Sequence, residues 1–199
     1  MGAGLAIFQQ ITGINTIIYY APTIFQLAGF SSAAQSILAT AGVGLVNVLL
    51  TILAVRLLDR SGRRPLLLTG IAGMTLSLVA LGFVFLLGSH SSSLGWLAVG
   101  SVMLYVASFA ISLGPIFWLL IAEIYPLRIR GVAMGAVTMT NWAFNLIVAL
   151  TFLLLVEKLG PAPTFWVYAL VSIASWIFAW RMVPETKGRT LEEINEDWR

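Results

Sequence analysis

The sequence predicts an all-α membrane protein built as a bundle of six transmembrane helices, and two observations support this prediction. Hydrophobic residues make up 59% of the 199 residues and charged residues only 10%, whereas a soluble domain contains about 25% charged residues. The charged residues also fall into four clusters, which lie at 56–64, 123–130, 157–158 and 181–199. Because a helix needs about 20 apolar residues to cross a bilayer, the uncharged segments between the clusters have room for six spans.

The spans follow from these segments in order. Residues 1–55 hold two spans, separated by the turn-forming residues 29–32, and residues 65–122 hold two more, separated by the serine-rich residues 88–93. The last two uncharged segments hold one span each. The first span has no basic segment before it and carries polar residues in its middle, so we interpret it as a membrane helix and not as a signal peptide. The six predicted spans cover about 3–28, 33–57, 65–87, 95–123, 131–156 and 162–181.

Together the spans form one transmembrane domain, residues 1–182, composed of two three-helix repeats. Residues 183–199 are predicted to form a cytoplasmic tail with a short helix. Thr190 and Glu193 have the spacing of a capping box at the start of that helix.

The orientation follows from the distribution of positive charge, because cytoplasmic loops are enriched in Lys and Arg. Ten of the 11 Lys and Arg residues follow the second, fourth or sixth span, and only Lys158 lies on the opposite side. These segments and both termini are therefore expected in the cytoplasm, in a multi-pass protein of the cell membrane. The net charge of +3 reflects this topology, so the expected partner is the lipid bilayer and not nucleic acid.

Neutral polar residues lie inside the spans, where they usually face a cavity or another helix. Amide side chains donate and accept hydrogen bonds at once, and a tryptophan offers an apolar surface to a sugar ring. This combination suits a neutral, hydroxyl-rich ligand, although packing between helices explains the amides about equally well. The candidate substrate-binding residues are Gln9, Gln10, Asn15, Asn47, Trp118 and Asn141.

Helix geometry sets a condition on this hypothesis. At about 100° per residue, a straight first span would not point Gln9, Gln10 and Asn15 into one pocket. They converge if the helix is wide open to the cavity or unwinds near Gly13, and Pro115 invites a similar break in the fourth span. Spans one and four begin the two repeats, and interrupted helices at matching positions are typical of transporter binding sites.

Four motifs together resemble the sugar porter family of the major facilitator superfamily. Three of them are the continuous segments 9–15 (QQITGIN), 59–65 (DRSGRRP) and 184–189 (PETKGR). The remaining motif is spread over 114–131 and consists of Gly114, Pro115, Trp118, Glu123, Ile124, Pro126, Arg128, Arg130 and Gly131. The four motifs occur in the order of helices seven to twelve of that family, and the resemblance covers essentially the whole chain. The fold it implies is the carboxy-terminal half of the twelve-helix major facilitator fold.

The resemblance implies transport of a hexose or pentose by alternating access, with the six candidate residues lining the sugar site. Ala110 stands where facilitative glucose carriers often have a glutamate and bacterial sugar–proton symporters commonly have alanine, which favours the bacterial symport type. Six helices are half of the family's twelve, and Met1 lies too close to Gln9 for another half to precede it. We therefore expect the chain to pair with an amino-terminal half, to self-associate, or to be a fragment of a longer transporter.

The resemblance also favours a charged network that ties the cytoplasmic helix ends together in the outward-facing state. The alternative is positive-inside topology with exposed ion pairs, each contributing only about 0–1 kcal/mol. The residues expected in the network are Asp59, Arg63, Arg64, Glu123, Arg130 and Glu185.

Two other functional classes are considered. A non-transporting sugar sensor or scaffold could keep the same architecture, but such proteins usually carry long cytoplasmic extensions. A membrane enzyme is disfavoured, because no span contains a His, Asp or Glu constellation for acid–base or metal chemistry. No catalytic residue, metal or cofactor is therefore predicted, and the sequence leaves open the sugar, the coupling and the direction of transport.

Overall fold

The computed structural model describes residues 1–30, 32–88 and 92–188, and their side chains except those of Asp59, Ser92 and Ser93. Within these residues the chain forms nine α-helices and no strand, which confirms the all-α prediction. The helix predicted after Thr190 lies outside the described residues.

Within the described part of the chain, five segments are long and apolar enough to cross a membrane. Four of them are the single helices α4 (Ala33–Ser61), α5 (Arg63–Leu86), α8 (Arg130–Leu159) and α9 (Pro161–Met182). The fifth segment is Leu94–Ile124, which comprises most of α6 (Ser92–Ala110) and all of α7 (Leu113–Ile124).

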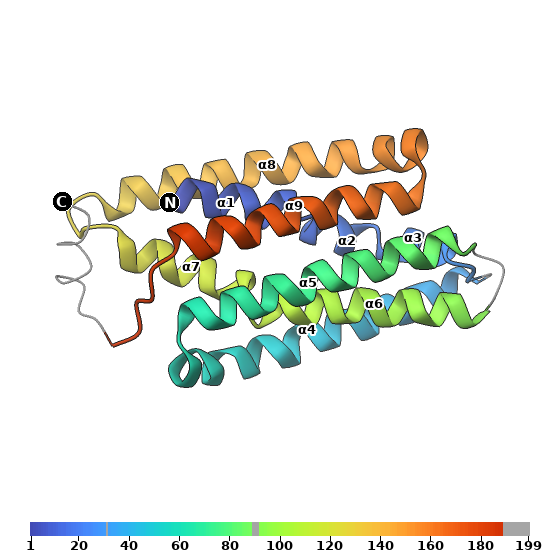
Figure 1. Cartoon of the computed structure of the whole chain (residues 1–199), viewed down its shortest axis with the longest axis horizontal. Helices are drawn as coiled ribbons and strands as arrows, with labels where there is room; N and C mark the ends of the chain where they lie inside the picture. The colour runs from blue at the N-terminus through green and yellow to red at the C-terminus, as the bar shows by residue number, and fades with distance from the viewer. Residues whose placement is uncertain (31, 89–91, 189–199) are drawn as a thin grey trace.

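The first predicted span is divided into three short helices. They are α1 (Gly2–Ile11), α2 (Ile14–Tyr19) and α3 (Ala21–Leu27), and they follow one another along the bundle (Figure 1). These helices have different neighbours, since α1 packs mainly against α8 and α3 against α4 and α6.

The connections rich in basic residues gather at one end of the bundle. Met1, the α4–α5 turn, the α7–α8 connection and the segment after α9 all lie at the left end in Figure 1. We call this the basic end. Its composition agrees with the grouping of Lys and Arg in the sequence, since these segments follow alternate spans.

Two of the tight turns depend on glycine. Gly62 joins α4 to α5 with φ 84° and ψ 165°, and Gly160 joins α8 to α9 with φ 86° and ψ 163°. Positive φ is open to glycine without the steric cost that a β-carbon brings. Pro161 then occupies the first position of α9, where its missing N–H is not needed.

The bundle is held by close helix packing. α5 packs against α9 and α6, and α1 packs against α8. Small residues allow the closest approaches, since a β-carbon at Gly70 or Gly73 would collide with Ser112 or Ser108 of the facing span. Such small-residue contacts are typical of helices in membranes. The long helix α4 is far less enclosed, because only 11% of its apolar window is buried.

Candidate functional site

The first span breaks where the sequence analysis expected it to unwind. α1 ends at Ile11, and Gly13 has φ 92° in the left-handed region before α2 begins at Ile14. The ring of Tyr168 packs against Gly13, so that a β-carbon there would lie 3.0 Å from Tyr168 Cδ1. Both the backbone conformation and the close approach require glycine, and the hypothesis of an interruption near Gly13 is confirmed.

The fourth span also breaks, but not at the proline. α6 ends at Ala110 and α7 begins at Leu113, with Ser112 at φ −129° and ψ −103° between them. Pro115 lies in the first turn of α7, where a residue without an N–H loses no helical hydrogen bond. The predicted break is therefore present, three residues earlier than Pro115 suggested.

Four amide side chains form one continuous hydrogen-bonded chain beside these breaks. Asn15 Nδ2 donates to Gln10 Oε1 at 2.9 Å, and Gln10 Nε2 donates to Asn141 Oδ1 at 2.9 Å. Asn141 Nδ2 donates in turn to Gln9 Oε1 at 2.6 Å, and Gln9 Nε2 donates to the backbone carbonyl of Leu113 at 2.9 Å. Because a backbone carbonyl can only accept, this last bond fixes the direction of the whole amide chain.

The amide chain borders a pocket of about 240 Å³. Gln9, Gln10 and Asn141 are buried, and Asn15 at the free end of the chain is half-buried. Among the described residues, Oδ1 of Asn15 has no hydrogen-bond donor, so it can accept one from a ligand. The pocket is lined by Gln9, Gln10, Ile14, Asn15, Phe109, Gly114, Trp118, Asn141 and Trp142.

Five of the six candidate substrate-binding residues therefore line one pocket, and Asn47 does not. Asn47 lies half-buried on α4, where its backbone carbonyl accepts a hydrogen bond from the Thr51 hydroxyl at 2.7 Å. Trp142 also lines the pocket but was not among the residues predicted from the sequence; its side chain is 60% exposed, compared with 41% for Trp118. Its position next to Asn141 in the sequence was the available signal. The pocket thus has two large aromatic surfaces on its open side.

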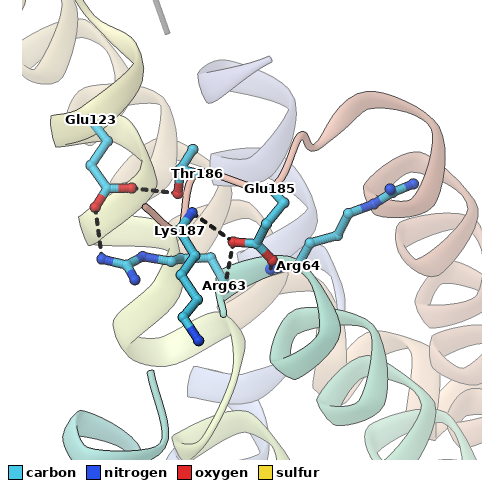
Figure 2. A network of polar contacts seen from close by, with 6 residues as sticks. All are labelled: Arg63, Arg64, Glu123, Glu185, Thr186 and Lys187. Carbon is cyan, nitrogen blue, oxygen red and sulfur yellow. Dashed lines mark hydrogen bonds and ion pairs between the residues drawn. The ribbon is translucent and has the colours of Figure 1, made fainter. Parts of the chain in front are cut away.

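A second group of polar residues meets at the basic end, and Figure 2 shows it. Arg63, at the start of α5, forms an ion pair with Glu123 near the end of α7, with 3.2 Å between Nη2 and Oε1. The Thr186 hydroxyl donates to the other oxygen of Glu123 at 2.7 Å. Glu123 therefore joins α7 both to the α4–α5 turn and to the segment that follows α9.

Glu185 binds the first backbone N–H groups of α5. One carboxylate oxygen accepts hydrogen bonds from the N–H groups of Arg63 at 3.0 Å and Lys187 at 2.9 Å, and the other accepts one from the N–H of Arg64 at 3.1 Å. A negative charge is favourable at a helix amino terminus. Burial opposes ionisation of Glu185, but these hydrogen bonds and one from the N–H of Thr186 outweigh it and lower the pKa of the carboxyl below its ordinary value.

The guanidinium groups of two arginines expected in the network bind backbone carbonyls instead of carboxylates. Arg64 Nη2 donates to the carbonyl of Trp180 at 2.6 Å, near the end of α9, and Arg130 Nε donates to the carbonyl of Tyr125 at 3.1 Å. The cation of Arg64 is well placed there, because a helix carboxyl terminus carries a partial negative charge. The prediction for the Asp59 side chain lies outside the described residues.

Comparisons with known proteins identify a matching family and several similar proteins. The profile of a family described as "Sugar (and other) transporter" matches residues 1–198. Over its full length the chain is 44% identical to the putative metabolite transport protein YwtG of Bacillus subtilis, and over 99% of its length it is 41% identical to the galactose–proton symporter of Escherichia coli. It spans 43% and 42% of those two proteins, respectively.

A solved structure shares the fold. All of the chain superposes on part of the E. coli proton:xylose symporter XylE bound to 6-bromo-6-deoxy-D-glucose, with a TM-score of 0.88 and 38% identity. The chain covers 42% of that protein, so the match extends over somewhat less than half of a complete transporter.

Proposed function

The chain belongs to the sugar (and other) transporter family, and from this premise we propose that it forms the carboxy-terminal half of a monosaccharide transporter that works by alternating access. Its fold is one half of a major facilitator transporter. The continuous amide chain along the pocket is the observation that carries the proposal, because it supplies both donors and acceptors for a hydroxyl-rich solute without any charge.

The chemistry of the pocket supports a hexose or pentose as the substrate. A sugar hydroxyl can donate to Asn15 Oδ1 and accept from the second N–H of Gln10, while Trp118 and Trp142 cover the apolar face of the ring. No titratable side chain lines the pocket within the described residues, which makes an organic acid or an ion a poor ligand. Two of the relatives are named as a galactose–proton symporter and a proton:xylose symporter, in agreement with this substrate class.

A second half is proposed to complete the site. The exposed faces of Trp118 and Trp142 leave one side of the pocket uncovered, and a sugar bound there would keep much of its surface in water. Because the chain spans only 42% of the galactose–proton symporter, an amino-terminal six-helix half is the expected partner. Self-association of the chain is the alternative arrangement.

The charged residues at the basic end are proposed to control access. We place the basic end and both termini in the cytoplasm, since the Lys and Arg residues concentrate there. Glu123 and Glu185 connect α7, the α4–α5 turn and the segment after α9, so these bonds favour a closed cytoplasmic side. Rocking of the helices that opens this side would have to break them.

The proposal is tested by sugar counterflow in liposomes. The chain is reconstituted together with the amino-terminal half of the E. coli galactose–proton symporter, and exchange of radiolabelled galactose, xylose and arabinose is measured. We expect exchange of at least one sugar that is lost in Asn15→Ala. Absence of exchange for every sugar, despite correct assembly, overturns the proposal. Sugar binding without exchange would instead favour a sensor.

A further inference from the structure

The break in the first span leaves the buried backbone carbonyl of Thr12 without a helical partner. Thr12 lies between α1 and α2, and no backbone N–H of the described residues donates to its oxygen. The hydroxyl of Tyr105 on α6 donates to this oxygen at 2.8 Å. Thr12 is fully buried and Tyr105 is 1% exposed, so water cannot replace the phenol. Leaving a buried carbonyl unpaired is costly, and the Tyr105 hydroxyl removes that cost.

The shape of the pocket depends on this break. In a straight helix, Gln10 and Asn15 would point about 140° apart around the axis. In the broken span, Asn15 Nδ2 lies 2.9 Å from Gln10 Oε1, and both residues line the pocket. The angle between α1 and α2 therefore decides whether the two amides can act on the same ligand.

The two broken spans hold each other in place. Tyr105, just before the break in the fourth span, bonds to the break in the first span. In return, Gln9 Nε2 in the first span donates at 2.9 Å to the carbonyl of Leu113, the first residue of α7. These two hydrogen bonds connect the two repeats, so a change in backbone conformation at one break would alter the contacts of the other.

We propose that Tyr105 is a positioning residue for the sugar pocket, whose hydroxyl fixes the angle between α1 and α2 and so brings Asn15 beside Gln10. Tyr105 does not line the pocket and acts only through the Thr12 carbonyl. The expected effect on sugar affinity rests on the proposed function. The restraint that Tyr105 places on the break does not depend on any ligand.

The test compares Tyr105→Phe with Tyr168→Phe in the chain assembled with the amino-terminal half used above. Tyr168 is a suitable control because its ring contacts Gly13 at the same break, while its hydroxyl has no partner among the described residues. Binding of galactose and xylose is followed by the fluorescence of the pocket tryptophans. We expect Tyr105→Phe to weaken sugar affinity about tenfold and Tyr168→Phe to leave it unchanged. Equal affinities for the two variants overturn the inference.

A double-substitution cycle separates positioning from general stability. If Tyr105 acts by placing Asn15, then adding Tyr105→Phe to Asn15→Ala causes no further loss of affinity. A further tenfold loss in the double variant would show that Tyr105 supports the fold and not the placement of Asn15, and it overturns the inference.

Hydrogen exchange provides the readout that needs no sugar. In the sugar-free assembly, residues 11–18 are expected to exchange faster in Tyr105→Phe than in the unsubstituted chain, with no change in Tyr168→Phe. Unchanged exchange in Tyr105→Phe contradicts the inference even when sugar binds. Faster exchange in an assembly that binds no sugar supports the restraint on the break and counts only against the proposed function.

Discussion

Gly62 lies so close to Glu185 that a β-carbon at position 62 would come within 2.7 Å of a carboxylate oxygen. The space left by the missing side chain lets this carboxylate reach the N–H groups of Arg63 and Arg64, the first two residues of α5. The turn between α4 and α5 is thereby joined to the segment after α9. A glycine is needed here both for its positive φ and for the room that it leaves.

Gly62→Ala is therefore expected to lower the free energy of unfolding by about 2 kcal/mol or more, through backbone strain and displacement of the carboxylate. The matched control is Gly160→Ala, because Gly160 has nearly the same φ and ψ but its nearest neighbour to a β-carbon is Pro163 Cδ at 3.9 Å. Chemical denaturation of the chain in detergent measures both. Equal losses in the two variants would assign the effect to the backbone alone.

The stability of the chain should depend on pH through Glu185. Hydrogen bonds lower its pKa below the ordinary 4.5, so its contribution to stability is present above that pH and is lost as the pH falls below it through the folded-state pKa. We expect the unfolding temperature of Glu185→Gln to be below that of the unsubstituted chain near neutral pH, and the difference to shrink below pH 4.5. Glu157→Gln, at an exposed position late in α8, serves as the control. If the difference in unfolding temperature between Glu185→Gln and the unsubstituted chain persists unchanged at low pH, the charge of Glu185 is not its cause.

The ion pair between Arg63 and Glu123 should restrain the basic end more than it stabilises the fold. A glutamine at position 123 keeps an oxygen that can accept a hydrogen bond from Arg63, and both side chains retain 18% exposure, so Glu123→Gln is expected to cost about 1 kcal/mol of stability. Amide exchange in residues 62–66 and 185–188 should nevertheless accelerate, because α7 is released from both segments. Thr186→Val removes only one of the bonds to Glu123 and should cause a smaller acceleration. If amide exchange in both segments stays unchanged in Glu123→Gln, then Glu123 does not restrain the basic end.

Much of this arrangement could be predicted from the sequence, because charge and glycine act locally. The uncharged segments marked the spans, and the off-face positions of Gln9, Gln10 and Asn15 required an interruption that Gly13 permits. The break in the fourth span was misplaced, since Pro115 fits the first turn of a helix as well as it ends one. Nothing local indicates that Ser112 would lie against Gly70 and mark the break instead.

The partners of individual side chains could not be predicted in the same way. The resemblance favoured a network in which Arg64 and Arg130 meet carboxylates, but their side chains donate to backbone carbonyls at the ends of α9 and α7. Glu185 is bound by backbone N–H groups, which no pattern of charges reveals. Such pairings depend on tertiary distances, and these arise only when helices distant in sequence have packed.

Asn141 is expected to be the central member of the amide chain. Its side chain bonds to both Gln9 and Gln10, so Asn141→Ala removes one hydrogen-bond partner from each of two buried amides and should weaken sugar affinity at least about tenfold. Asn145→Ala is the matched control, because Asn145 is also buried on α8 but does not line the pocket. Tryptophan fluorescence titration with galactose and xylose measures both variants. The role of the amide chain fails if Asn145→Ala weakens binding as much as Asn141→Ala does.

Trp142 lines the pocket although it was not among the predicted site residues. It allows a test of the site that is independent of the amides. Its side chain lines the pocket next to Asn141 and is 60% exposed, so a ligand or the second half can cover its apolar surface. Trp142→Ala should therefore weaken both sugar binding and the association of the two halves. Trp118 is the less exposed of the two aromatic side chains, so Trp118→Ala should weaken sugar binding more than it weakens association. Trp96→Ala is the control, since Trp96 is 64% exposed but lies on α6 away from the pocket. Sugar titration and co-purification of the two halves separate the effects, and normal values of both in Trp142→Ala would remove this residue from the site.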